Sequence, residues 1–162
     1  MGTRGLRLPI RRGTNAAGPT GAARNKKMLA RKGLEGARVL IIEDEGLIAA
    51  DIVNMLWELG CVPSGIARTV ADALEVIDSG AQIDCVTLDI RLDTEIAGAV
   101  GGLLISKGIP FVVCSAYAIS LRDFPQIPIL QKPLTIEQLR QGLERALGIS
   151  HPLGIEMAQG VE

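Results

Sequence analysis

Val86-Thr87-Leu88-Asp89-Ile90-Arg91 is a short apolar run that closes on an acid. Val86 and Leu88 favour a buried strand, so the chain would turn just after Asp89 and leave its carboxylate at the carboxyl end of that strand. In an open parallel sheet, ligands bind at that edge. Taken alone, Asp89 is a metal ligand, a nucleophile or an acid that caps a loop.

Three other apolar runs also end in polar residues. Ile41-Ile42 runs into Glu43-Asp44-Glu45, and Val112-Val113-Cys114 runs into Ser115. The run from residue 127 to residue 131 ends at Lys132-Pro133. If all four runs are parallel strands, their polar ends meet at one edge of the sheet. The alternative for each is plain: acids favour helix N-termini, and Ser115 and Lys132 can be ordinary loop residues.

Strand and helix patterns alternate along the chain. The predicted strands cover residues 37–42, 61–67, 83–88, 109–114 and 127–131. Helices are predicted over residues 47–59, 69–79, 96–107 and 135–147, with Thr69 and Thr135 as N-caps and a loop or poor helix over residues 116–124. This order predicts an α/β fold, a five-stranded doubly wound parallel sheet flanked by about five helices.

The composition suits such a fold. Hydrophobic residues make up 48% of the chain, but only four residues are aromatic, so the core must be aliphatic. No apolar run is long enough to predict a membrane span. Cys61, Cys85 and Cys114 lack metal-ligand spacing and lie in or beside apolar runs. We therefore expect buried, reduced thiols and a cytoplasmic protein.

The charge is distributed unevenly. Residues 1–36 contain nine Lys or Arg against one acid, whereas residues 37–148 contain eight basic and fifteen acidic residues. We expect a basic, disordered extension over residues 1–36, one domain over 37–148 and a tail over 149–162. Three interpretations of the extension stay open. It is a solvated tail, or an arm that contacts nucleic acid. Alternatively, Met28 is the true start of the protein, and the residues before it come from a wrongly assigned gene start. Apart from that arm, nothing predicts nucleic-acid binding.

The order of the polar strand ends resembles the receiver domain of two-component response regulators. Glu43-Asp44, Asp89, Ser115 and Lys132-Pro133 stand in the order of that family's motifs. The stretch from Gly108 to Tyr117 is similar to the Pro-Phe…Phe-Ala-Thr-Gly-Tyr segment of the alphaproteobacterial FATGUY receivers. The resemblance covers residues 37–148 and implies a flavodoxin-like, receiver-type fold. It also implies a single-domain response regulator.

The resemblance implies a phosphoacceptor that needs Mg²⁺. Asp89 would take a phosphoryl group from a histidine kinase or a histidine phosphotransfer protein. Mg²⁺ would be bound by Glu43, Asp44, Asp89 and the backbone carbonyl of Arg91, because hard oxygen ligands suit this ion. The protein would then be no turnover enzyme.

The same resemblance assigns the neighbouring roles. Lys132 would contribute a fixed positive charge and Ser115 a hydroxyl hydrogen bond to the phosphoryl group. The family implies a cis Lys132-Pro133 bond. Ile129 replaces a common aromatic switch, so Tyr117 becomes the expected switch residue. A downstream protein would bind the face made by residues 116–147.

Two other functions fit part of the pattern. One is a pseudo-receiver, a protein-interaction module that works without phosphate. The other is a phosphatase of the haloacid dehalogenase type, which also uses an aspartate at a strand end. That class needs a second aspartate two residues later, where this chain has Arg91.

Overall fold

The computed structural model describes residues 33–92, 95–118, 121 and 125–149. Within them, five strands form one parallel sheet in the order β2-β1-β3-β6-β7. The strands are β1 (Arg38–Ile42), β2 (Val62–Ala67), β3 (Cys85–Asp89), β6 (Phe111–Ser115) and β7 (Ile129–Gln131). The prediction of a five-stranded parallel sheet is confirmed, with strand bounds shifted by one or two residues.

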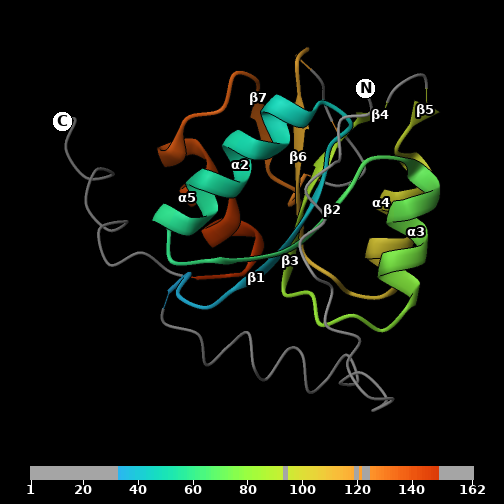
Figure 1. Ribbon diagram of the computed structural model, residues 1–162, viewed down its shortest axis with the longest axis horizontal. Coiled ribbons are helices and arrows are strands. Elements are labelled where there is room, and N and C mark those ends of the chain that lie inside the picture. The colour runs from blue at the N-terminus through green and yellow to red at the C-terminus, as the bar shows by residue number, and fades with distance from the viewer. Residues whose placement is uncertain (1–32, 93–94, 119–120, 122–124, 150–162) are drawn as a thin grey trace, which may run out of the picture.

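Helices cover both faces of this sheet (Figure 1). They are α2 (Gly46–Glu58), α3 (Val70–Asp78), α4 (Gly98–Ser106) and α5 (Ile136–Ala146). Helices α2 and α5 lie on one face, and α3 and α4 lie on the other. The described residues thus contain four helices, while residues 119–120 and 122–124 of the possible fifth lie outside them. So do residues 1–32 of the extension and most of the tail.

Each central strand contributes to two cores. In β1, Val39 and Ile41 pack under α2 and α5, while Leu40 and Ile42 pack under α3 and α4. Successive side chains of a strand point to opposite faces, so a strand covered on both sides must be apolar throughout. This explains why the strand sequences show continuous apolar runs rather than alternation. The core is almost wholly aliphatic, with Phe111 its aromatic member among the described residues.

The helix starts follow local capping chemistry. The Thr69 side chain accepts a hydrogen bond from the Asp72 amide, and Thr135 forms a reciprocal capping box with Gln138. Both predicted N-caps are therefore confirmed. Helix α2 begins differently: Glu45 is its N-cap residue, but its side chain makes no capping hydrogen bond.

One element was not predicted from the sequence. After Asp89, the strands β4 (Arg91–Leu92) and β5 (Glu95–Ile96) pair as an antiparallel ribbon, where the sequence suggested a loop and then a helix start at Ile96. Helix α4 begins only at Gly98. Two-residue strands carry too little alternation to be recognised in a sequence.

The three cysteines give a direct test of the packing. All three side chains are buried, and burial raises the pKa of the Cys85 thiol and of the Cys114 thiol to about 12. A thiol that is buried and protonated reacts poorly with electrophiles. We expect no labelling by a thiol reagent in the native protein at pH 8, and labelling of all three in denaturant, as measured by mass spectrometry. Rapid labelling of the native protein would contradict this packing.

Candidate functional site

The site lies where the strand order reverses. The chain moves from β1 outward to β2, and then returns to place β3 on the other side of β1. Crevices at the carboxyl ends of strands flanking such a reversal are the usual binding sites of open α/β sheets. Glu43 follows β1 directly, and Asp89 is the last residue of β3. The fold therefore puts two acids at its reversal point.

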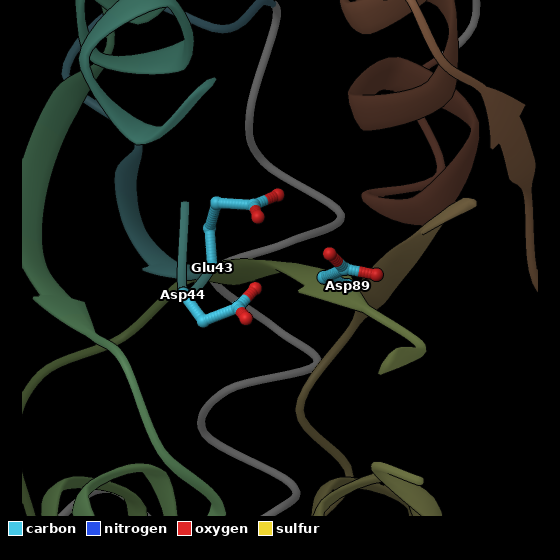
Figure 2. A group of neighbouring side chains, drawn as sticks. All are labelled: Glu43, Asp44 and Asp89. Atoms are coloured by element: carbon cyan, nitrogen blue, oxygen red, sulfur yellow. The ribbon is translucent and has the colours of Figure 1, made fainter. Parts of the chain in front are cut away.

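Three carboxylates meet there. Glu43, Asp44 and Asp89 each offer an oxygen, and these oxygens lie within 4.8 Å of one another (Figure 2). Glu43 and Asp89 are buried, with 1% and 7% of their surface exposed, and Asp44 is half-buried. Three hard, anionic oxygen donors at this spacing fit a small divalent cation such as Mg²⁺. The structure brings together the three carboxylates that the sequence analysis named, but their role as metal ligands, like that of the Arg91 carbonyl, stays a prediction.

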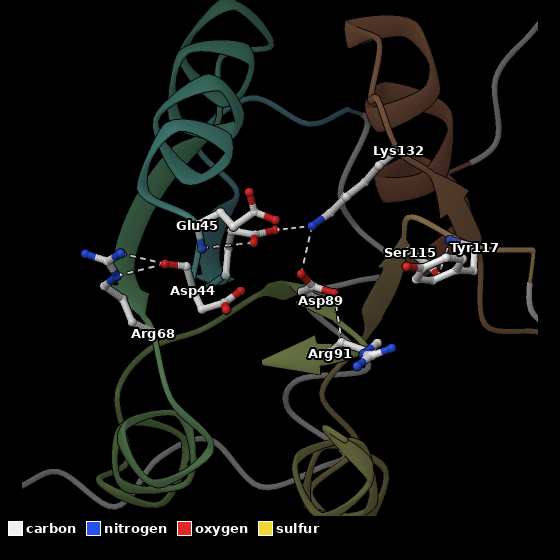
Figure 3. A network of polar contacts seen from close by, with 9 residues as sticks. Asp44, Glu45, Arg68, Asp89, Arg91, Ser115, Tyr117 and Lys132 are labelled. Carbon is white, nitrogen blue, oxygen red and sulfur yellow. Dashed lines mark hydrogen bonds and ion pairs between the residues drawn. The ribbon is translucent and has the colours of Figure 1, made fainter. Parts of the chain in front are cut away.

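Lys132 contacts two of these acids, although it follows the edge strand β7. Its ammonium lies 2.7 Å from Glu43 Oε2. It also lies 2.7 Å from Asp89 Oδ2, and Figure 3 shows this ion pair. Only 10% of the Lys132 side chain is exposed, so water screens these pairs weakly. Lys132 follows β7, and its peptide bond to Pro133 is cis. The structure thus brings Glu43, Asp89 and Lys132 into direct contact.

This burial changes the acid–base behaviour of the site. Burial raises the pKa of the Glu43 carboxyl from 4.5 to about 7, and the Asp89 charge acts in the same direction, although the Lys132 ammonium opposes it. Burial alone would favour a neutral Lys132 amine, but its hydrogen bonds to Asp89 and Glu43 hold the pKa of Lys132 above its usual value. Lys132 therefore stays charged at neutral pH, and a bound cation would displace a fraction of a proton from Glu43.

Backbone amides orient two of the carboxylates. The Arg91 amide donates to Asp89 Oδ1 at 3.0 Å, and the Glu45 amide donates to Glu43 Oε1 at 3.2 Å. Each carboxylate thus has one oxygen fixed by the backbone and the other held by Lys132. The Arg91 side chain itself is exposed.

Ser115 and Tyr117 lie beside this group, at the end of β6. Ser115 is buried, and its hydroxyl accepts a hydrogen bond from the Tyr117 amide at 3.1 Å. The Tyr117 side chain is 64% exposed. Ser115 is one residue beyond Cys114, the register partner of Asp89, so it stands at the same sheet edge. Within the described residues the Ser115 hydroxyl is hydrogen-bonded to the Tyr117 amide and not to Asp89, and the switch role of Tyr117 remains a prediction.

Arg68 contacts the site, although no sequence pattern indicated it. It follows β2, and its Nε and Nη2 atoms donate to the Asp44 carbonyl oxygen at 3.2 and 2.5 Å. This two-pronged contact of the Arg68 guanidinium, here called the fork, fixes the backbone of Asp44, one of the three carboxylate residues. An arginine after a strand gives no sequence signal for such a contact, because the contact depends on β2 lying beside β1.

Comparisons with known proteins agree with this geometry. No family model matches the chain. The phyllosphere-induced regulator PhyR of Methylorubrum extorquens is 35% identical over 81 residues, which are 49% of this chain and 30% of PhyR. The chain thus spans less than a third of that curated relative.

Two solved structures match over nearly their whole length. SdrG from Sphingomonas melonis Fr1 is 34% identical with a TM-score of 0.62, and the match covers 69% of this chain and 97% of SdrG. A response regulator receiver protein from Sinorhizobium medicae WSM419 is 27% identical with a TM-score of 0.61, covering 72% and 98%.

Removing Lys132 tests the ion-pair group. In Mg²⁺-free buffer, Lys132→Met should lower the free energy of unfolding by about 3 kcal/mol, because two buried acids lose their cation. Lys107→Met is the matched control, since Lys107 pairs with the exposed Asp78 at 2.9 Å and should cost under about 1 kcal/mol. Urea denaturation measures both. If both variants lose the same free energy of unfolding, Lys132 stabilises the protein no more than a surface lysine does.

Replacing Arg68 tests how the Asp44 backbone is held. Arg68→Lys keeps the charge but cannot form the fork, so Mg²⁺ should bind roughly three- to tenfold more weakly. Arg145→Lys is the control, because the one hydrogen bond of Arg145 among the described residues goes to the Pro125 carbonyl, at 3.4 Å. Calorimetric titration with Mg²⁺ measures both variants. An unchanged dissociation constant for Arg68→Lys would contradict this role.

Proposed function

The chain belongs to the receiver domains of response regulators, and from this premise we propose that it accepts a phosphoryl group on Asp89 in two-component phosphorelay signalling. One observation carries the proposal. A nearly buried aspartate stands beside two further acids and is held by a charged lysine at 2.7 Å. A loop-capping acid would need neither the lysine nor the other carboxylates.

Phosphoryl transfer to Asp89 needs in-line attack and charge compensation. One Asp89 carboxylate oxygen attacks the phosphorus of a phosphohistidine, the P–O bond forms as the P–N bond breaks, and the leaving imidazole is protonated from solvent. Protein groups contribute mainly by positioning and by electrostatic stabilisation in such transfers. The Arg91 amide fixes the Asp89 carboxylate, and Lys132 offers positive charge to the incoming oxygens.

The acidic cluster supplies the binding site for the metal. Glu43, Asp44 and Asp89 would bind Mg²⁺ with the Arg91 carbonyl, and the ion would neutralise charge on the phosphoryl group. Before the metal binds, Lys132 offsets the repulsion among the carboxylates. A buried acid cluster of this kind should gain stability when the cation binds.

Ser115 and Tyr117 would read the phosphorylated state. The Ser115 hydroxyl now accepts from the Tyr117 amide, and it would donate a hydrogen bond to a phosphoryl oxygen on Asp89. Because Tyr117 is tied to the same hydroxyl through its backbone, a shift of Ser115 would move the Tyr117 segment. A downstream protein would recognise that change on the face made by residues 116–147.

The comparisons support this assignment at the level of similarity. The BeF₃-activated conformation of SdrG has been solved. Its sequence is 33% identical to this chain, and its structure matches with a TM-score of 0.60, covering 72% of this chain and 99% of SdrG. Beryllofluoride is therefore a suitable reagent to test here. The donor would be a histidine kinase or phosphotransfer protein, and the chain would be a phosphoacceptor rather than a turnover enzyme. Within the described residues, no helix has the length and apolarity that a membrane crossing requires.

Asp89→Asn tests the proposed phosphoacceptor. Incubation with acetyl phosphate and Mg²⁺ should add one phosphoryl group to the wild type, seen by intact-mass spectrometry, and none to Asp89→Asn, which lacks the attacking carboxylate. Asp51→Asn, which changes an exposed acid on α2, should label like the wild type. Removing Mg²⁺ with a chelator should slow wild-type labelling at least tenfold.

The other two functions give different results in the same experiment. A pseudo-receiver would show no labelling of the wild type with acetyl phosphate or with a panel of phosphorylated histidine kinases. A phosphatase would release phosphate continuously from a phosphomonoester, and loss of that turnover in Asp89→Asn would favour it. Labelling that persists in Asp89→Asn would place the acceptor elsewhere.

A further inference from the structure

Helix α4 contains two interior glycines that the packing of the fold does not require. Gly101 and Gly102 have helical backbone, and a methyl group added at either would meet no neighbouring group within 4 Å. Glycine in a helix interior is destabilising relative to alanine, because more backbone entropy is lost on folding. Gly142 of α5 differs, since a methyl group there would meet side-chain atoms of Leu130 at 3.0 and 3.1 Å. Packing thus explains the glycine of α5 but not those of α4.

Helix α4 also lacks the local contacts that stabilise a short helix. Its N-cap residue is Ala97, whose side chain makes no capping hydrogen bond, and residues 98–106 include no charged residue. Helix α5, by contrast, begins with the capping box of Thr135 and contains two internal ion pairs. Helix α4 is therefore held to the sheet by the burial of Val100 and Leu104, with little support from its own sequence.

A short series of backbone hydrogen bonds joins the start of α4 to Asp89. The Arg91 amide donates to Asp89 Oδ1 at 3.0 Å, and Arg91 belongs to the β4–β5 ribbon. Ala97 follows that ribbon directly, and its amide donates to the Ile90 carbonyl at 3.0 Å. The Ala97 carbonyl in turn accepts from the Gly101 amide at 3.0 Å, which is the first hydrogen bond of the helix. The first turn of α4 and the Asp89 carboxylate are thus bonded to the same short ribbon.

We propose that residues 97–102 and the β4–β5 ribbon form a unit that unfolds locally, more often than the other helices open, and that stays closed when the Asp89 site is occupied. Local openings of this kind occur in the least stable elements of a protein. An open ribbon would no longer hold the Arg91 backbone at Asp89. A ligand that needs Arg91 in place therefore binds the closed form better and makes opening rarer. The opening itself is independent of the function proposed above, whereas its link to Asp89 rests on the proposed metal site.

Hydrogen exchange of backbone amides, followed by NMR in Mg²⁺-free buffer, tests the opening. The amide of Gly101 is compared with three amides at the same position of their helices, each bonded to the N-cap carbonyl: Ala49 in α2, Ala73 in α3 and Leu139 in α5. We expect the protection factor at Gly101 to be at least tenfold lower than at these three. Equal protection at all four amides would overturn the proposal, because α4 would then open no more often than the other helices.

Two variants test the cause of the opening. Gly102→Ala should raise the protection factor at Gly101 about fivefold, because alanine favours the helix and its methyl group meets no neighbour. Gly142→Ala is the matched control in α5, where the methyl group must displace Leu130, so the protection factor at Leu139 should not rise. If Gly102→Ala leaves Gly101 unchanged, or if both variants protect their helices alike, the unneeded glycines do not set the opening and the proposal fails.

Adding Mg²⁺ alone to the wild type tests the link to Asp89. At a free concentration ten times the dissociation constant, the protection factor at Gly101 should rise at least threefold, and about elevenfold if the open form binds no Mg²⁺. The protection factor at Ala73 should stay within twofold. No rise at Gly101, an equal rise at both amides, or no Mg²⁺ binding at all would each contradict the link. A wild type that binds Mg²⁺ but takes no phosphoryl group would defeat the proposed function and leave this link intact.

Discussion

The Lys132 ammonium between Glu43 and Asp89 is the interaction on which the rest of the site depends. Two nearly buried carboxylates beside a third would otherwise repel one another in a poorly screened environment. The lysine comes from the opposite half of the sheet, 89 residues along the chain from Glu43. The contact therefore forms only when β1, β3 and β7 are all in register. The ion-pair group is thus complete only in the fully folded protein.

The sheet topology explains why such a contact is possible. The strands are parallel, so every carboxyl end reaches the same edge, and the reversal at β1 and β3 separates the loops that follow them. The two aliphatic cores then fix the strands from both faces. Tight core packing keeps side chains at the edge in one arrangement, which positional catalysis requires. The polar group at the edge contains few residues, and the apolar cores beneath it hold their side chains in fixed positions.

Much of this was predictable because strand ends are visible in a sequence. Apolar runs ending at Glu43, Asp89, Ser115 and Lys132 placed these residues at one edge, since parallel strands share their carboxyl end. The contacts of Arg68 were not predictable, because they depend on which strands are neighbours and on side-chain geometry. The β4–β5 ribbon was missed because its strands are too short to show a period. The role of Tyr117 still rests on resemblance.

The most direct test of the account is an NMR titration of the amide signals with beryllofluoride and Mg²⁺. If the separated segments form one site for a cation and a phosphoryl group, the largest shifts will cluster at residues 43–45, 89–91, 115–117 and 132, and Asp89→Asn will abolish them. Shifts that are absent from the wild type, or that fall away from this edge of the sheet, would contradict the account.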